Sequence, residues 1–272
     1  MQSFNKTAII TGAAKGIGRA AALKFASEHF NITLVDISQQ ELQQVYEEIK
    51  NLYEADLLMC CGDLADWNFL QHITTKTIEK WERIDVLVNN AAWRTLETMR
   101  TISIESWERT MRICLTAPAF LAKQSAEVME RLVTGGTILN ISSVMSERAG
   151  GSGPAYISAK GAIESLTYEL AVTYGRSSIR AVCVQPGFIE TNLSHDYKDP
   201  QGNNISDIMI EHVKESTPLG RGGQPEEISE ALYWLTTDAA SFITGTTLLI
   251  DGGLKHNFNS YPMKKLQFPD QF

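Results

Sequence analysis

A tyrosine and a lysine stand four residues apart in the segment YISAK, at Tyr156 and Lys160. If this segment is helical, both side chains lie on one face, so a phenol and an ammonium are neighbours. A free phenol has a pKa of about 10 and is a weak base near neutral pH. A neighbouring positive charge favours the phenolate, which can accept the proton of an alcohol. The spacing is compatible with acid–base chemistry on a hydroxyl group, and an accidental pairing of the two residues is the alternative.

A glycine-rich turn precedes this pair, in the segment TGAAKGIG at residues 11–18. Gly12, Gly16 and Gly18 permit a tight turn and a close approach of the backbone to a ligand. The helix that we expect to begin at Ile17 offers unpaired N–H groups and the positive end of its dipole, which suit a pyrophosphate. The turn predicts a dinucleotide site, and an ordinary strand-to-helix loop is the alternative.

Asp36 ends the second apolar run, 18 residues after Gly18. A carboxylate at that place can accept hydrogen bonds from an adenosine ribose, and it repels a 2′-phosphate. Lys15 could attract such a phosphate, but Ile37 supplies no second cation. We therefore predict NAD as the cofactor in preference to NADP. The alternative is that Asp36 only caps the following helix.

Short apolar runs alternate with longer amphipathic segments along the chain. The runs predict strands at residues 7–12, 32–36, 56–64, 84–92, 136–143, 179–187 and 246–253. The segments predict helices at 17–29, 38–52 (with Ser38 as N-cap), 67–81, 103–131 and 155–175. Continuous apolar strands separated by helices are typical of a parallel sheet covered on both faces. The fold class is therefore α/β, and we expect one domain because no linker divides the 272 residues.

Two segments fit no element of this sheet. Residues 188–224 are polar and follow the sixth strand, where ligands bind in such folds. We expect a substrate lid there, with a helical piece at 205–215, and a surface loop is the alternative. The C-terminal extension, residues 254–272, carries four aromatic residues: Phe258, Tyr261, Phe268 and Phe272. Free chain ends are rarely so aromatic, so we expect the extension to pack against a protein surface.

These features together resemble the short-chain dehydrogenase/reductase family over about residues 5–253. The resemblance rests on segments in the family's order and spacing: TGAAKGIG (11–18), DL (63–64), NNAA (89–92), NISS (140–143), YISAK (156–160), PGFIET (186–191) and ITGTTLLIDGG (243–253). It implies a Rossmann-type, doubly wound parallel sheet of seven strands in a single domain at residues 1–253. It also implies an NAD-dependent enzyme that acts on secondary alcohols.

The resemblance implies roles for individual residues. Ser143, 13 residues before the tyrosine, would hydrogen-bond the substrate oxygen as the alcohol becomes a carbonyl. Tyr156 would take the hydroxyl proton while a hydride leaves for NAD⁺, and Lys160 would tune Tyr156 and bind the nicotinamide ribose. Cofactor contacts are implied for Gly12, Lys15, Gly16, Ile17, Gly18, Asp36, Asp63, Leu64, Asn89, Ala91, Tyr156, Lys160, Pro186, Gly187, Ile189 and Thr191. For Asn89, stabilisation of the sheet end is the alternative.

One residue departs from the family's pattern. The family places an asparagine seven residues after a tryptophan in the helix before the fifth strand, and here Cys114 follows Trp107 at that distance. That asparagine supports a helix irregularity and a water that links the lysine to solvent. Cysteine is a poor hydrogen-bonding substitute, but a neighbouring main-chain carbonyl does not depend on the side chain. We expect an active enzyme with a modified proton relay, and we do not expect Cys114 to be a nucleophile.

The residues expected to line the substrate pocket follow NNAA and NISS or lie in the lid. They are Trp93, Arg94, Met145, Glu147, Arg148, Phe188 and His195. Such a set is too polar for a fatty-chain or steroid slot. Arg94 and Arg148 could bind a carboxylate, sulfonate or phosphate, or with Glu147 they could bind sugar hydroxyls, unless both arginines face solvent. No ligand spacing accompanies His195, so we predict no metal site.

A sugar, a polyol or a small hydroxy acid is the substrate class that this pocket favours. A 3-oxoacyl thioester is the alternative, although Asp36 disfavours it because reductive biosynthesis usually uses NADPH. A non-catalytic NAD-binding regulator is a second alternative. Cys114 supports it, and the intact Ser143, Tyr156 and Lys160 oppose it.

The composition limits the partners and the compartment. A net charge of −8 without a basic run argues against a nucleic-acid surface or an anionic membrane surface. Four cysteines without a C-x-x-C pair suit free thiols in a reducing cytoplasm. The first residues lack the basic and apolar parts of a signal peptide, and no apolar run reaches the ~20 residues of a membrane helix.

The family resemblance also implies a homotetramer. Its contacts would use the helices at 103–131 and 155–175 and the last strand. In such an assembly the extension at 254–272 could reach the pocket of a neighbouring subunit. A small-molecule substrate completes the expected partners.

Overall fold

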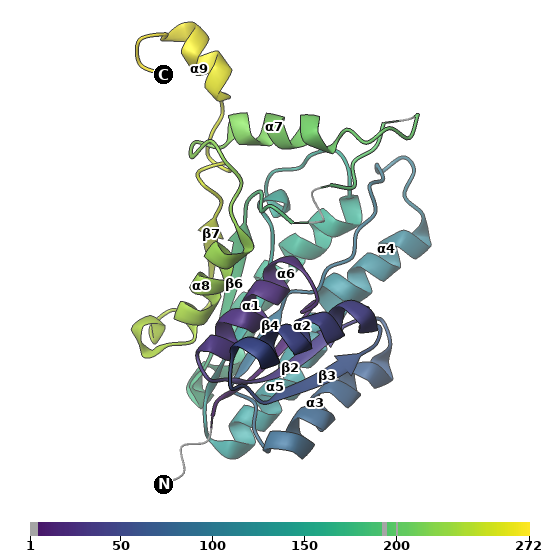
Figure 1. Ribbon diagram of the computed structural model, residues 1–272, viewed down its shortest axis with the longest axis vertical. Coiled ribbons are helices and arrows are strands. Elements are labelled where there is room, and N and C mark those ends of the chain that lie inside the picture. The colour runs from purple at the N-terminus through teal and green to yellow at the C-terminus, as the bar shows by residue number, and fades with distance from the viewer. Residues whose placement is uncertain (1–4, 192–194, 200) are drawn as a thin grey trace.

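The strands meet in a sheet whose spatial order differs from their order along the chain. The computed structural model describes residues 5–191, 195–199 and 201–272. Within these ranges seven parallel strands run in the order β3-β2-β1-β4-β5-β6-β7 (Figure 1). Their bounds are β1 Thr7–Thr11, β2 Asn31–Asp36, β3 Leu57–Cys61, β4 Val86–Asn89, β5 Gly136–Ile141, β6 Ile179–Pro186 and β7 Thr246–Ile250. The chain winds outward in both directions from β1 and β4, and ligands bind at that switch point in open α/β sheets.

Helices cover both faces of the sheet (Figure 1). One face carries α1 (Gly16–Ser27), α2 (Gln39–Leu52) and α8 (Pro225–Leu235). The other carries α3 (Trp67–Trp81), α5 (Ala117–Leu132) and α6 (Pro154–Tyr174), with α4 (Ile104–Met111) leading into α5. The predicted Rossmann-type α/β fold is confirmed. In the part of the chain that the structure describes, no helix is long and apolar enough to span a bilayer.

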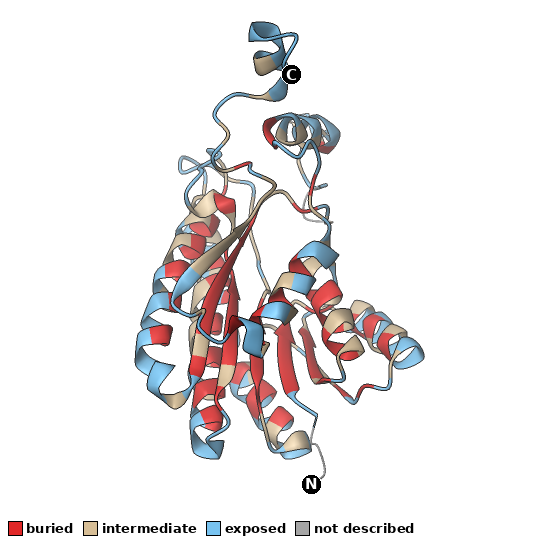
Figure 2. Cartoon of the chain, turned by 90° about the vertical axis from the view of Figure 1, so that its left-hand side faces the viewer, coloured by how far each residue is buried: buried red, intermediate tan, exposed pale blue. Residues whose placement is uncertain are grey.

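Successive residues of a strand face opposite helical layers. In β1, Ala8 and Ile10 pack with α1, α2 and α8, whereas Ile9 packs with α3, α5 and α6. All three side chains are completely buried. Because both faces of the sheet are covered, the strands are continuously apolar rather than alternating. Figure 2 shows the buried residues concentrated in the sheet and on the inner sides of the helices.

A π-helical turn, Arg112–Thr116, interrupts the helix predicted at 103–131. The regular helix α4 ends before it, and α5 begins after it. Such turns insert a residue into a helix and are frequent at functional sites. The other predicted helices, at 17–29, 38–52, 67–81 and 155–175, match α1, α2, α3 and α6 to within two residues at each end. Ser38 occupies the N-cap position of α2, as predicted.

The predicted lid and the C-terminal extension lie beyond the carboxyl edge of the sheet. The lid contains α7, Ser206–Ser216, one residue later than predicted. Residues 192–194 and 200 of the predicted lid are outside the described residues. The extension leads to a short helix, α9 (Tyr261–Gln267), which stands beyond α7 and away from the sheet (Figures 1 and 2). Phe258 is 97% exposed, so the extension finds little of the expected packing surface within its own chain.

Candidate active site

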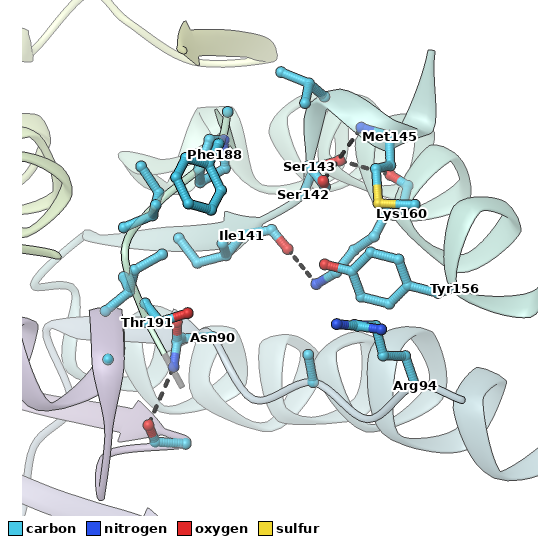
Figure 3. Close-up of a pocket in the computed structure, with 18 of the residues that line it drawn as sticks. Asn90, Arg94, Ile141, Ser142, Ser143, Met145, Tyr156, Lys160, Phe188 and Thr191 are labelled. Atoms are coloured by element: carbon cyan, nitrogen blue, oxygen red, sulfur yellow. Dashed lines mark hydrogen bonds between the residues drawn. The ribbon is translucent and has the colours of Figure 1, made fainter. Parts of the chain in front are cut away.

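A cavity of about 580 Å³ lies at the carboxyl ends of the strands (Figure 3). Its walls are the glycine-rich turn, the loops after β4 and β5, the first turns of α6 and the segment after β6. Many of the predicted site residues line it: Gly12, Lys15, Gly16, Ile17, Asp36, Ala91, Arg94, Ser143, Met145, Tyr156, Lys160, Pro186, Gly187, Phe188, Ile189 and Thr191. The predicted cofactor residues and the predicted chemistry therefore share one space.

The glycine-rich turn has a shape that larger residues would disrupt. Gly12 has a φ of +66°, and a Cβ atom there would lie 2.9 Å from the Ala91 Cα atom. A Cβ atom on Gly18 would lie 2.0 Å from the Gly12 carbonyl oxygen. Gly16 and Ile17 begin α1 and line the cavity. The first N–H groups of a helix have no intrahelical partners, so this wall fits the pyrophosphate of a dinucleotide.

Asp36 joins the glycine-rich turn to α2. Its Oδ2 atom accepts the Ala14 N–H at 3.1 Å, and its Oδ1 atom accepts the Ser38 N–H at 3.1 Å. The carboxylate also lines the cavity, so the predicted capping and ribose-binding roles are compatible. Lys15, at the same end of the cavity, forms an ion pair with Glu41. The Lys15 ammonium holds the pKa of the Glu41 carboxyl below its usual range.

The residues of the predicted chemistry face the cavity from two elements (Figure 3). Tyr156 and Lys160 lie one turn apart on α6, and both are buried. Lys160 Nζ donates a hydrogen bond to the Ile141 carbonyl oxygen at 2.6 Å and lies 5.5 Å from the centre of the Tyr156 ring. Ser143 follows β5, and its Oγ atom accepts the Met145 N–H at 3.2 Å. A phenol, a hydroxyl and an ammonium in this arrangement can exchange a proton with an alcohol.

Cys114 lies at the centre of the π-helical turn and joins it to the loop after β4. Its Sγ atom lies 3.4 Å from both the N and the O atom of Trp93, so the thiol accepts one hydrogen bond and donates another. The side chain is buried. The helix irregularity that the family resemblance associates with asparagine is thus present with cysteine. The two weak hydrogen bonds of the Cys114 sulfur anchor the loop that carries Arg94.

The charged residues predicted near the substrate divide into two places. The Arg94 side chain is 7% exposed and lines the cavity. Arg148 is exposed and donates a hydrogen bond to the Leu254 carbonyl oxygen. Glu147 is also exposed, and it pairs with Lys255, whose ammonium holds the pKa of Glu147 below its usual range. Arg148 and Glu147 therefore contact the start of the extension rather than the cavity.

Some predicted residues lie outside the wall of this cavity: Gly18, Asp63, Leu64, Asn89, Trp93 and His195. Gly18 belongs to the glycine-rich turn, and His195 is exposed. Asp63 forms an ion pair with Arg109 at 2.9 Å. Burial pushes the pKa of Asp63 upward, but hydrogen bonds from the Ala65 N–H and from Arg109 hold it below its usual range. Asp63 thus has partners of its own within the protein.

Asn90 lines the cavity where we expected its neighbour Asn89. Asn89 is buried, and its Nδ2 atom donates to Asn140 Oδ1 at 2.9 Å, as sheet-end stabilisation would require. Asn90 Nδ2 donates to the Thr11 carbonyl oxygen at 2.9 Å. The sequence signal that could have identified Asn90 as a lining residue was its place in the segment NNAA. Other lining residues that sequence reasoning missed are Ala92, Ile141, Ser142, Val144, Asp196, Tyr197, Val213 and Leu254.

A buried carboxylate supports the serine loop from behind the cavity. Glu164 Oε1 accepts hydrogen bonds from Ser142 Oγ at 2.5 Å, Ser146 Oγ at 2.7 Å and Gln185 Nε2 at 2.9 Å. Glu164 is on α6, and Gln185 is near the end of β6. Ser142 and Ser146 flank Ser143 on either side. The helix that carries Tyr156 is therefore tied to the loop that carries Ser143.

Comparisons with known proteins agree with this geometry. Residues 12–255 match the family model described as enoyl-(acyl carrier protein) reductase. An uncharacterized oxidoreductase of Thermotoga maritima is 35% identical, over 92% of this chain and 95% of its own length. L-rhamnose 1-dehydrogenase (NAD(P)(+)) of a Sphingomonas species is 31% identical, over 93% and 97%. The crystal structure of a short-chain type dehydrogenase/reductase from Mycobacterium marinum has a TM-score of 0.83 at 28% identity, over 92% and 96%.

Proposed function

Because the chain belongs to the short-chain dehydrogenase/reductase family, we propose that it transfers a hydride between NAD(H) and a secondary alcohol or ketone. The observation that supports this most directly is the cavity that Ser143, Tyr156 and Lys160 share with the glycine-rich turn. An alcohol beside these three residues would lie in the same space as a dinucleotide on the turn.

The mechanism assigns one task to each residue. Bound NAD⁺ supplies the acceptor for the hydride. Tyr156 Oη accepts the hydroxyl proton of the alcohol, and Ser143 Oγ donates a hydrogen bond to the same oxygen as it becomes a carbonyl. Lys160, held by the Ile141 carbonyl oxygen, keeps a positive charge beside the phenol while the proton moves. The same groups act in reverse when a ketone is reduced.

Asp36 and Lys15 together favour NAD over NADP. A carboxylate at the end of β2 accepts hydrogen bonds from ribose hydroxyls and repels a 2′-phosphate. Lys15 lines the same part of the cavity, but its ammonium already pairs with Glu41. A 2′-phosphate would therefore have to compete with Glu41 for the Lys15 ammonium while Asp36 repels it.

The substrate that we propose is a polar secondary alcohol, such as a sugar, a polyol or a hydroxy acid. Arg94 and Asp196 bring charged groups to the wall of the cavity. The similarity to an L-rhamnose 1-dehydrogenase also supports a polar substrate. Reduction of a 3-oxoacyl thioester is the second candidate, because the matching family model is described as an acyl-carrier-protein reductase.

We also propose that the protein forms a homotetramer in the cytoplasm. Tyr168 and Val172 are exposed on the outer face of α6, and β7 is an edge strand. Exposed apolar side chains and an open strand edge suit contacts between copies. The free thiols suit a reducing compartment: Cys60, Cys61, Cys114 and Cys183. A single-chain mass by light scattering would reject the tetramer.

Replacing Tyr156 with Phe tests the function because it removes the atom that accepts the proton. We expect Tyr156→Phe to lower kcat by about 10²–10⁴-fold, with NADH binding unchanged. Turnover is followed by NADH absorbance, with sugars, polyols, hydroxy acids and other secondary alcohols as substrates. Tyr174→Phe, at the other end of the same helix and outside the cavity wall, is the control. Full turnover in Tyr156→Phe would refute the role of Tyr156, and a wild-type protein that binds NADH without any turnover would favour a regulator.

A further inference from the structure

Arg94 presents its guanidinium to the cavity beside Tyr156 (Figure 3). The loop that carries it is held on both sides. The Trp93 main chain is bonded to the π-helical turn, and the Glu97 carbonyl oxygen accepts the Gly153 N–H at 2.7 Å, just before α6. The side chain itself is 7% exposed. Arg94 is therefore a preorganised cation next to the proposed base, rather than a surface charge.

The acidic partner of Arg94 comes from the opposite wall, in the segment after β6. Arg94 NH2 donates to Asp196 Oδ1 at 2.9 Å, and the guanidinium lies 5.5 Å from the centre of the Tyr197 ring. The Asp196 side chain is 46% exposed. An ion pair with a carboxylate in contact with water is weak. A substrate carboxylate shielded inside the cavity could form two parallel hydrogen bonds with the guanidinium, which would make it the stronger partner.

The rest of the lining leaves room for an anion. Apolar side chains from several elements take part: Met145, Phe188, Val213 and Leu254. Lys160 adds a second positive charge near Tyr156. The carboxylates among the described lining residues are those of Asp36 and Asp196. Asp36 is at the end of β2 beside the glycine-rich turn, and Asp196 is the one that contacts Arg94. In a protein with a net charge of −8, this local excess of positive charge favours an anionic ligand.

We propose that the substrate is a hydroxy acid and that Arg94 binds its carboxylate in place of Asp196. This inference rests on the dehydrogenase function proposed above. The carbinol of the acid would then lie at Ser143 and Tyr156. On oxidation its C–H and O–H bonds break, the hydride passes to NAD⁺ and the proton to Tyr156. The carbinol becomes a ketone, and the carboxylate is unchanged.

A neutral sugar is the alternative occupant, and Asp196 distinguishes the two. If Asp196 competes with a substrate carboxylate for Arg94, then Asp196→Asn should lower the KM of the substrate. If Asp196 instead accepts a hydrogen bond from a sugar hydroxyl, the same change should raise the KM. The two hypotheses therefore predict opposite signs for one substitution.

The test compares 2- and 3-hydroxy acids with their primary amides, which keep the shape without the charge. Lactate, 3-hydroxybutyrate and gluconate are suitable acids, with neutral polyols beside them. We expect the wild-type protein to prefer its best acid to the matching amide by about 100-fold in kcat/KM, and Arg94→Met to remove most of that preference. Arg94→Lys should retain part of it. Arg100→Met, an exposed arginine in the same loop, is the control.

The outcomes separate this inference from the function on which it rests. Equal kcat/KM for acids and amides, turnover of neutral polyols alone, or a higher KM in Asp196→Asn would overturn the anionic substrate and leave a dehydrogenase. No NADH formation from any acid, amide or polyol, by a protein that binds NADH, would reject both. NADH binding by each variant shows that it is folded.

Discussion

At the scale of single residues, Asp36 stabilises the fold and lines the cavity in which we propose that the cofactor binds. Its two oxygens hold the main chain of the glycine-rich turn and the start of α2. The same carboxylate lines the cavity. From the sequence, helix capping and ribose binding by Asp36 were alternatives, because a sequence does not show where each carboxylate oxygen points. The structure makes the two roles compatible, so a substitution has to separate them.

Replacing Asp36 with Asn should shift the preference between cofactors. Asn keeps one of the two oxygens that accept the Ala14 and Ser38 N–H groups, and it removes the charge that repels a 2′-phosphate. We expect kcat/KM to fall about tenfold with NAD and to rise with NADP. Steady-state kinetics with both cofactors measures the ratio. Asp66→Asn, at the N-cap of α3, is the control, and an unchanged ratio in Asp36→Asn would leave Asp36 with a capping role only.

The sequence predicted the segments around the cavity better than the individual side chains. Asn89 and Asn90 are adjacent, yet Asn89 is buried under the sheet end and Asn90 lines the cavity. Choosing between them requires the residue at which β4 ends. Cys114 presents the same difficulty, because its partner Trp93 is distant in sequence. Contacts of this kind depend on packing, which composition and spacing do not specify.

At the scale of elements, strands were predicted too long at their carboxyl ends. The strand expected at 84–92 ends at Asn89, and the strand expected at 246–253 ends at Ile250. The residues past these ends are small, in the segments NAA (90–92) and DGG (251–253), and residue size does not mark where strand pairing stops. The π-helical turn was hidden for a similar reason, since one inserted residue barely disturbs the apolar periodicity of 103–131.

Through Glu164, helix α6 positions the loop that carries Ser143 in addition to Tyr156. Glu164→Ala should remove the acceptor that Ser142, Ser146 and Gln185 share. Each donor keeps a second acceptor, so we expect a cost of about 0.5–1.5 kcal/mol for each hydrogen bond lost. We expect a lower Tm and a fall in kcat of at least tenfold, with little change in NADH affinity. Steady-state kinetics and NADH titration separate the two quantities.

Two further variants define what Glu164 does. Glu164→Gln keeps one acceptor oxygen and should recover part of kcat. Glu169→Ala removes an exposed carboxylate from the same helix and should leave kcat unchanged. If Glu164→Ala loses stability but keeps the wild-type kcat at a temperature where it is folded, the network serves the fold and not the position of Ser143.

At the scale of the whole molecule, the extension differs from the chain that carries it. It contains Lys255, Lys264 and Lys265 against Asp270, whereas the whole chain has a net charge of −8. Several of its apolar side chains are exposed: Phe258, Tyr261, Met263, Leu266, Phe268 and Phe272. The sequence predicted that such a segment needs a packing surface. It could not supply the location, because that surface is largely missing from the extension's own chain.

Deleting residues 258–272 tests whether a second copy supplies this surface. The deletion keeps Leu254 in the cavity wall and Asn257, whose Nδ2 atom donates to the Ser216 carbonyl oxygen at 2.7 Å. Since the removed side chains are mostly exposed, we expect the secondary structure of the chain to be unchanged. The KM should rise, or the assembly should break into smaller species.

Light scattering and steady-state kinetics on the same truncated preparation distinguish these results. Fewer chains per particle than in the full-length protein would mean that the extension contributes to an interface, because burial of its aromatic side chains would then hold the copies together. A higher KM at unchanged mass would mean that it covers a cavity without holding the assembly. Unchanged mass and unchanged KM would contradict both, and the aromatic surface would then need a partner other than this protein.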